Sequence, residues 1–355
     1  MTIERVIVTG GAGFIGTAVV RQLLDRRVAV LSLDALTYAA SPEAVDGDAI
    51  PAGYRLEAGD VRDSADVARV LTDFQPDGVI HLAAESHVDR SIDGPRAFLE
   101  TNVTGTFVVL ETVTSWWREL GGPSRERFRL VHVSTDEVFG SLEPDDPPFT
   151  AETPYRPRSP YSASKAAADH FARAWHETYG LPVIVTNCSN NFGPWQFPEK
   201  FIPVVISRAL AWEPIPIYGA GDQVRDWLHV EDHASGLLAA LERGAPGSTY
   251  LFGARNEWSN RALAELICDL LDGMVPDKRG ARRKLLENVT DRPGHDSRYA
   301  IDPSLAEREL GWEPRHTFTD ALRDTIRWYV DHRSWAEDRL AKLGGYRRRG
   351  LGESA

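Results

Sequence analysis

The stretch Val6-Ile7-Val8-Thr9-Gly10-Gly11-Ala12-Gly13-Phe14-Ile15-Gly16 decides the fold of this chain. Residues 6–9 are a short apolar, β-rich run, and the glycines after them form a loop. Apolar residues at helical spacing then predict a helix over 17–25. A strand, a glycine loop and a helix in this order are typical of a dinucleotide-binding unit. There the backbone approaches a pyrophosphate at the N-terminus of the helix.

The chain downstream of this stretch continues the same pattern. A second apolar run, Val28–Leu33, ends at Asp34, whose carboxylate can accept hydrogen bonds from ribose hydroxyls and so favours NAD over NADP. Asp60 follows a third short strand, where contact with the adenine and capping of the helix from Ser64 are equally good interpretations. The fourth buried run, residues 79–84, ends in small residues that leave space for a cofactor.

Strands and amphipathic helices alternate through residue 188, which predicts an α/β fold with a doubly wound parallel sheet of the Rossmann type. The pattern then changes to a loop rich in proline and aromatic residues, followed by a helix from residue 201. We therefore expect a smaller, mainly α/β, C-terminal substrate lobe. The predicted division is 1–188 plus about 226–255 for the NAD-binding domain, about 189–225 plus 256–335 for the substrate lobe, and a solvated tail over 336–355.

Composition excludes several classes of protein. The net charge of −12 over 355 residues argues against nucleic-acid binding, and no apolar run approaches the ~20 residues that a membrane helix needs. Because a strand is predicted from residue 5, we expect no signal peptide. Cys188 and Cys268 are the only cysteines, so we expect neither a disulfide framework nor a metal site built on thiolates. These features favour a protein of the reducing cytoplasm.

Two further motifs carry the chemistry. Ser134-Thr135-Asp136-Glu137 ends a buried apolar run, and Tyr161-Ser162-Ala163-Ser164-Lys165 opens a helix after Ser159 and Pro160, which suit its N-cap and first turn. Tyr161 and Lys165 are four residues apart and share one helix face. An ammonium beside a phenol favours the phenolate, which suits a base that takes a proton from an alcohol as hydride leaves.

The adjacent acids Asp136 and Glu137 are the unusual addition, because an alcohol dehydrogenase needs only the Tyr/Lys pair. In isolation, two acids in a row are more often an exposed loop pair, but Thr135 before them and Tyr161 after them favour a catalytic role. Consecutive residues of a strand point to opposite faces. We therefore expect both acids to lie beyond the strand end, on a loop at the carboxyl edge of the sheet.

These residues together resemble the extended short-chain dehydrogenase/reductase superfamily, and within it the dTDP-glucose 4,6-dehydratases. The resemblance runs to about residue 330 and is specific at 84–91, 134–138, 187–191, 196–200, 225–230 and 292–296. The Asp136–Glu137 pair separates the chain from 4-epimerases of the superfamily. Departures are Ala35 in place of a lysine, Phe139 and Phe192 in place of tyrosines, and a longer, more basic stretch over 272–290.

The resemblance implies the conversion of dTDP-glucose to dTDP-4-keto-6-deoxyglucose with tightly bound, recycled NAD. Tyr161 would take the C4 hydroxyl proton, Glu137 the C5 proton, and Asp136 would protonate the departing C6 hydroxyl. Mutual repulsion and burial favour one protonated and one ionised member of the acid pair. The implied catalytic residues are Thr135, Asp136, Glu137, Tyr161 and Lys165.

The resemblance also implies two sets of binding residues. The NAD contacts are Gly10, Gly13, Phe14, Ile15, Gly16, Asp34, Thr37, Asp60, Val61, Ala83, Ala84, Tyr161, Lys165 and Asn191. The contacts to the nucleotide sugar are Ser86, Thr135, Asn190, Lys200, Pro216, Tyr218, Arg225, Asn260, Arg292, His295 and Tyr299. Two helices are also apolar on more than one side, one through 102–117 and one from 161 to 179. Because the superfamily pairs such helices, the resemblance implies a homodimer with a four-helix interface.

Two groups of alternatives stay open. The first is another NAD-dependent nucleotide-sugar enzyme: a UDP-sugar 4,6-dehydratase, a 4-epimerase or a UDP-glucuronate decarboxylase. The second is a non-catalytic NAD-binding sensor, against which the intact Thr135, Tyr161 and Lys165 argue. His87 is a possible base, but a histidine at a strand end is more often structural.

Overall fold

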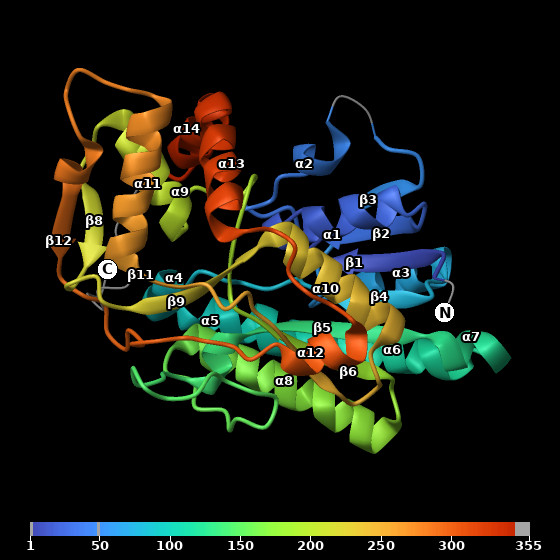
Figure 1. The fold of residues 1–355 in the computed structure, drawn as a ribbon. Helices are drawn as coiled ribbons and strands as arrows, with labels where there is room; N and C mark the ends of the chain where they lie inside the picture. The colour runs from blue at the N-terminus through green and yellow to red at the C-terminus, as the bar shows by residue number, and fades with distance from the viewer. Residues whose placement is uncertain (1–2, 48–49, 345–355) are drawn as a thin grey trace.

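The computed structural model describes residues 3–47 and 50–344. Its centre is a seven-stranded parallel sheet with the order β10-β6-β5-β4-β1-β2-β3 (Figure 1). The strands are β1 (Arg5–Thr9), β2 (Ala29–Asp34), β3 (Tyr54–Ala58), β4 (Gly78–His81), β5 (Arg129–Thr135), β6 (Val183–Cys188) and β10 (Thr249–Phe252). The strand order reverses between β1 and β4, so a ligand crevice is expected beyond their carboxyl ends.

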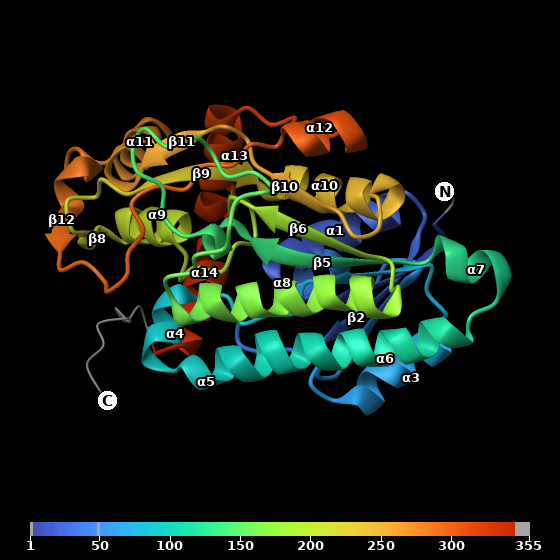
Figure 2. The ribbon, with the colours of Figure 1, turned by 90° about the horizontal axis from the view of Figure 1, so that it is seen from below.

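Helices cover both faces of this sheet (Figures 1 and 2). One face carries α1 (Phe14–Asp25), α10 (Val230–Arg243) and α12 (Ser304–Leu310), whose apolar residues share one hydrophobic cluster. The other face carries α3 (Ser64–Phe74), α6 (Thr106–Glu119) and α8 (Pro160–Tyr179), which share a second cluster. The predicted doubly wound α/β architecture is confirmed.

Short elements connect these layers. They are α2 (Glu43–Asp46), α4 (Val88–Asp93), α5 (Pro95–Phe98), a π-helix (Leu99–Gly105), α7 (Gly122–Arg127) and a 3₁₀ turn η2 (Asp136–Phe139). The π-helix continues directly into α6, so one long helical segment leads from α5 across the face of the sheet (Figure 2).

The second lobe has its own core. It contains the three-stranded sheet β11-β9-β7 and the pair β12-β8, formed by β7 (Asn190–Phe192), β8 (Ile215–Tyr218), β9 (Val224–His229), β11 (Glu257–Ser259) and β12 (Leu286–Val289). Its helices are α9 (Phe201–Ala211), α11 (Asn260–Met274), a 3₁₀ turn η3 (Arg282–Leu285), α13 (Phe318–Asp331) and α14 (Arg333–Lys342). A smaller α/β lobe was predicted after residue 188, and this lobe has that character.

Two boundaries differ from the predicted division. Residues 226–229 belong to β9, which pairs with β7 and β11 and not with the large sheet, whereas α10 and β10 do join the large domain as expected. The predicted solvated tail, 336–355, begins too early: residues 336–342 complete α14, where Ala336 is buried in the core of the second lobe. Residues 345–355 lie outside the described part of the chain.

The basic stretch 272–290 is neutralised within its own lobe. Arg282 is 2% exposed and donates to Asp272 Oδ1 at 2.7 Å and to the Ala209 carbonyl at 3.1 Å. Arg283 forms an ion pair with Asp269, and the cations of Arg279 and Arg282 lie over the Trp212 ring. These charges therefore stabilise the connection from α11 to β12. Within the described residues, no helix has the length and apolar character to cross a bilayer.

Candidate active site

The glycine loop after β1 presents free backbone donors at the start of α1. Gly10 has φ +71°, and a Cβ there would lie 2.8 Å from the Ala83 backbone, so only glycine fits between the ends of β1 and β4. Gly13 is the N-cap of α1 and has no side chain to satisfy the first N–H groups of the helix. Because these groups and the helix dipole favour an anion, the loop fits a pyrophosphate.

Asp34 lies at the carboxyl end of β2, where the fingerprint requires its acid. Its carboxylate accepts the N–H of Ala12 at 3.0 Å and of Leu36 at 2.8 Å, which fixes it against the glycine loop. Asp60 is not the cap of α3, because Asp63 takes that position, and Asp60 instead binds Arg62. Of its two interpretations, only contact with the adenine remains. The chain thus has the cradle and the acid that an NAD molecule needs.

The predicted catalytic residues come from three elements, β5, η2 and α8. β5 ends at Thr135, and Asp136 and Glu137 begin η2, so both acids lie beyond the strand as expected. The Thr135 hydroxyl accepts the N–H of Glu137 at 3.3 Å and lies 3.3 Å from Asp136 Oδ1. On α8, Ser159 caps the helix and forms a capping box with Ser162, which places Tyr161 in the first turn.

The two acids have different electrostatic surroundings. Asp136 is buried, and burial followed by the charges of Glu137 and Asp226 holds its pKa well above the ordinary value. Burial also raises the pKa of Glu137, but that residue is only partly buried, and the cations Arg292 and Arg225 oppose the rise. The pair therefore favours a protonated Asp136 beside an ionised Glu137. Asp136 Oδ2 has no hydrogen-bond partner among the described residues and is available to a ligand.

The pKa of Tyr161 is not lowered, contrary to what the neighbouring Lys165 led us to expect. Burial, and then the Glu137 carboxylate, hold its pKa well above the ordinary value, and only the Thr135 hydroxyl opposes this. Lys165 is itself buried, which lowers its pKa, and its ammonium donates to the Val133 carbonyl at 2.7 Å. The sequence predicted a favoured phenolate from the neighbouring lysine, whereas burial is the largest influence on the pKa of Tyr161 and acts in the opposite direction.

A buried polar network holds the end of β5 from behind. Asn187 donates to the Thr135 carbonyl at 2.9 Å and lies 3.4 Å from Asp169, a carboxylate with no solvent exposure. Asp169 also binds His132 at 3.0 Å and the Tyr155 hydroxyl at 2.7 Å. Because the backbone before Asp136 is fixed by these contacts, the acid pair is held in one position.

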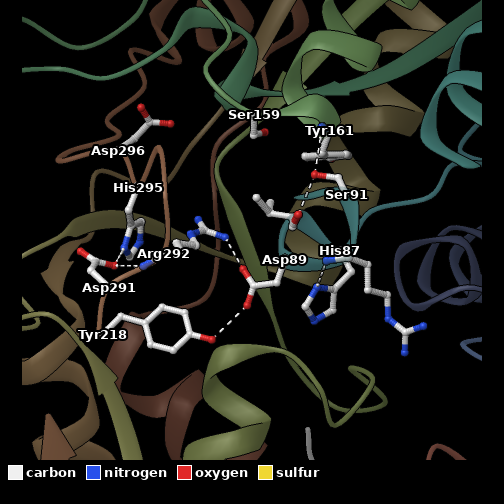
Figure 3. Close-up of polar contacts among 12 residues, drawn as sticks. His87, Asp89, Ser91, Ser159, Tyr161, Tyr218, Asp291, Arg292, His295 and Asp296 are labelled. Carbon is white, nitrogen blue, oxygen red and sulfur yellow. Dashed lines mark hydrogen bonds and ion pairs between the residues drawn. The ribbon is translucent and has the colours of Figure 1, made fainter. Parts of the chain in front are cut away.

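A second cluster joins residues of the two lobes (Figure 3). Asp89, on α4 of the large domain, accepts from Arg292 at 2.7 Å with Oδ1 and from the Tyr218 hydroxyl at 3.0 Å with Oδ2. His295 binds Asp291 at 2.7 Å, and Figure 3 shows its ring near Arg292 and Tyr218. Two predicted substrate residues, Arg292 and Tyr218, are thus joined by an acid that the prediction did not include, and the ring of the third, His295, lies 6.2 Å from that of Tyr218.

Arg225 and Tyr299 form the adjoining part of this surface. The Arg225 guanidinium lies 4.1 Å from the centre of the Tyr299 ring and donates to the Asp296 carbonyl at 2.9 Å, while the Tyr299 hydroxyl binds the Asp296 carboxylate. Lys200, the N-cap of α9, donates to the Ser86 carbonyl at 2.8 Å. Arg225, Arg292 and Lys200 all favour the ionised form of Glu137, so the cations lie near the acid pair.

The remaining predicted residues have fewer contacts with the acid pair and with the cluster around Asp89. Pro216 precedes Tyr218 by two positions on β8, and Asn260 begins α11, where its N–H donates to the Gln223 carbonyl. Asn190 keeps a buried side-chain oxygen without a partner in the described chain, which leaves it available to a ligand. Asn191 binds His233 at 2.9 Å. His87 caps α4 through Nδ1, which supports its structural interpretation.

Asp89, Asp169 and Glu199 are the polar residues that the sequence did not single out. Asp89 is in the 84–91 motif, so its position was marked, but its partner Arg292 is 203 residues away. Asp169 lies four residues after Lys165 on the same helix face, which is a local signal that could have found it. Glu199 is in the 196–200 motif and pairs with Arg90 at 3.0 Å.

The sheet, the glycine loop and the Tyr161/Lys165 helix define a member of the short-chain dehydrogenase/reductase class. A sequence model of the GDP-mannose 4,6 dehydratase family matches residues 7–325. A dTDP-glucose 4,6-dehydratase of Salmonella typhimurium is 50% identical over 351 residues, which cover 96% of each chain.

The solved structures agree with this similarity. A dTDP-glucose 4,6-dehydratase from Streptomyces venezuelae, solved with NAD and TYD bound, is 43% identical with a TM-score of 0.85, covering 95% of this chain and 100% of the other. A Thermus thermophilus UDP-glucose 4-epimerase, solved with NAD, is 28% identical with a TM-score of 0.80, covering 92% and 99%. The chain belongs to the dTDP-glucose 4,6-dehydratase family.

Proposed function

We propose that this chain converts dTDP-glucose to dTDP-4-keto-6-deoxyglucose with a bound NAD that each turnover regenerates. The observation that carries the proposal is the Asp136–Glu137 pair beside Tyr161, in which Asp136 is buried and Glu137 is the member whose ionised form the cations Arg292, Arg225 and Lys200 favour. Oxidation at C4 alone needs one base. The two further acids, one favoured protonated and one favoured ionised, suit removal of water across C5 and C6.

The first step assigns the proton of the C4 hydroxyl to Tyr161. Thr135 orients that oxygen, because its hydroxyl lies next to both Tyr161 and the acid pair. When bound, NAD would supply a hydride acceptor for C4, a hydride source for C6 and, in its oxidised form, a positive ring charge that would favour the phenolate. Lys165, on the same helix face as Tyr161, would hold the nicotinamide ribose.

The elimination step assigns one role to each acid. The 4-ketone makes the C5 proton acidic, and Glu137 takes it. Asp136 gives its proton to the departing C6 hydroxyl, which leaves as water, and a proton then returns to C5 as the hydride reaches C6. This division uses the carboxyl whose pKa is held higher as the acid.

The nucleotide diphosphate is assigned to the cationic surface of the second lobe. Arg225 and Arg292 suit the diphosphate, because a guanidinium can bind two phosphate oxygens at once. Tyr218 and Pro216 would form a wall beside the base, and Asn190, Lys200, Asn260, His295 and Tyr299 would complete the contacts, with Ser86 near the sugar. The NAD contacts are proposed for the glycine loop, Asp34, Thr37, Asp60, Val61, Ala83, Ala84 and Asn191.

The direct test is incubation of the purified protein with dTDP-glucose without added NAD, with UDP-glucose in parallel. The expected result is the alkali-induced absorbance of a 4-keto-6-deoxy product from dTDP-glucose alone. Product from UDP-glucose alone would indicate a UDP-sugar dehydratase. No product, even with NAD supplied, would contradict the roles of Asp136 and Glu137 and would favour an epimerase, a decarboxylase or a sensor.

We also propose a homodimer formed through α6 and α8, which lie side by side on one face (Figure 2). Phe171 and Tyr179 are exposed there and belong to a row of aromatic rings with Phe107 and Trp175. An apolar face of this kind is typical of a subunit interface.

Cys188 and Cys268 are free and buried, which supports a reducing, cytoplasmic location.

A further inference from the structure

Three side chains from distant parts of the sequence meet where the segment after β2, helix α4 and the start of the second lobe come together. Tyr38 follows β2, Arg90 lies on α4 after β4, and Glu199 precedes α9 at the start of the second lobe. We call Tyr38, Arg90 and Glu199 the bridging cluster. Two of its members, Tyr38 and Arg90, lie on segments of the large domain that follow β2 and β4. The third, Glu199, belongs to the lobe that would bind the sugar, so the cluster links the two lobes.

The contacts within the bridging cluster use both oxygens of one carboxylate. The Tyr38 hydroxyl donates to Glu199 Oε1 at 2.8 Å, and the Arg90 guanidinium donates to Oε2 at 3.0 and 3.2 Å. Arg90 also lies 4.0 Å from the centre of the Tyr38 ring. The Glu199 and Arg90 side chains are only 10% and 20% exposed, so solvent screens these charge-assisted bonds weakly.

The segment that carries Tyr38 lies directly against the glycine loop. Asp34 accepts the Ala12 N–H at 3.0 Å, and the Ser41 N–H donates to the Ala12 carbonyl at 2.7 Å. Residues 35–41 therefore leave the ribose-binding acid and return to the loop that would hold the pyrophosphate. A cofactor held by both Asp34 and the glycine loop would therefore lie beside residues 35–41.

A second contact from the same lobe holds the following turn. Glu43, at the start of α2, accepts from the indole N–H of Trp335 at 2.9 Å and forms an ion pair with Arg339, both on α14. The segment after β2 is thus tied to the second lobe at Tyr38 and again at Glu43. These ties are separate from the Asp89–Arg292 contact that joins the lobes at the sugar site.

We infer that Tyr38, Arg90 and Glu199 are cofactor-retaining residues, which keep residues 35–41 closed over NAD throughout the catalytic cycle. The inference rests on the proposed function, because only an enzyme that returns the hydride to its own product needs to keep its cofactor. Release of NAD requires this segment to open, so the contacts that hold the segment slow the release. None of the three residues takes part in the proposed proton transfers.

The test is the NAD content and the NAD dissociation rate of a Tyr38→Phe variant. This change removes the hydroxyl that binds Glu199 and keeps the ring that faces Arg90 and Phe197. The expected result is NAD release about tenfold faster than in the wild type, from the loss of one charge-assisted hydrogen bond. Gel-filtered Tyr38→Phe protein should then contain less NAD than the wild type, and added NAD should restore product formation.

Tyr250→Phe is the matched control. Tyr250 also donates its hydroxyl to a glutamate, Glu309 Oε2 at 2.9 Å, but lies on the edge strand β10 away from the segment after β2. Equal NAD retention in Tyr38→Phe and the wild type would overturn the inference, as would equal loss in Tyr250→Phe. If the wild type holds and uses NAD while Tyr38→Phe behaves normally, only the retaining role fails. A wild type without bound NAD or turnover would overturn the proposed function as well.

Discussion

At the scale of single residues, the site depends on a difference between two neighbouring carboxyl groups. Asp136 and Glu137 are adjacent, yet the cations of the second lobe act mainly on Glu137. Their titrations are coupled, so pH profiles report the pair, and the surroundings decide which member keeps the proton.

A Glu137→Gln variant separates the two halves of the proposed reaction. We expect formation of the 4-keto-6-deoxy product to fall at least about a hundredfold, because the amide cannot take the C5 proton. Oxidation at C4 uses Tyr161, so reduced cofactor should accumulate on the enzyme and be visible in its absorbance. The exposed residue Glu143, changed to Gln, serves as the control. Loss of both product and cofactor reduction would contradict the assignment of Glu137.

An Arg292→Ala variant should shift the acid limb of the pH profile of kcat. The cation favours the ionised form of Glu137, so its removal raises the pKa of that carboxyl above the already raised value. At any acidic pH, less Glu137 is then ionised and able to act as a base. With saturating substrate, we expect the acid limb to move to higher pH by about one unit. A shift to lower pH would show that Arg292 does not act on the base.

At the scale of elements, helix α8 and turn η2 bring the catalytic groups together. α8 begins at Pro160 under the Ser159 cap, so the start of the helix determines where Tyr161 lies. Replacing Ser159 by Ala removes the acceptor of the Ser162 N–H, and we expect the free energy of unfolding to fall by about 1 kcal/mol. Chemical denaturation measures this change. Ser115→Ala, at an exposed position within α6, should change stability by less than about 0.5 kcal/mol.

The elements that were predictable from the sequence have local signals. The glycine loop, the Ser159–Pro160 start of α8 and the two acids beyond β5 follow from strand alternation, capping preferences and the order of the motifs. The position of β9 was not predictable, because its mixed sequence suits a strand of either sheet and its pairing with β7 and β11 depends on residues far away in the chain. The burial of α14 likewise depends on contacts of Trp335 and Ala336 with distant helices.

The sequence allowed most residues of the candidate site to be predicted, but not the pKa values of its ionisable groups. The predicted set includes Tyr218, Arg292 and His295, which the fold does bring together, but not Asp89, which binds two of them from the other lobe. The raised pKa of Tyr161 also depends on desolvation, and burial by remote segments leaves no local sequence signal. Roles for these residues stay predictions until the variants above are measured.

At the scale of the whole molecule, the face formed by α6 and α8 determines the proposed assembly. We expect Phe171→Asp to convert the homodimer to a monomer, because a charge at the centre of the aromatic row would be buried without a partner. Light scattering at micromolar concentration measures the mass. Phe171→Leu keeps an apolar side chain and should remain dimeric. A wild-type protein that is monomeric under the same conditions would contradict the interface.

The route of the chain between the two lobes has a consequence for synthesis on the ribosome. Six of the seven strands of the large sheet are made by residue 188, but the edge strand β10 is made only after α9 and β9 of the second lobe. Until Phe252 has emerged, β6 is therefore an open sheet edge in the nascent chain. We expect this to be the stage of translation at which the chain is most prone to aggregate and most dependent on chaperones.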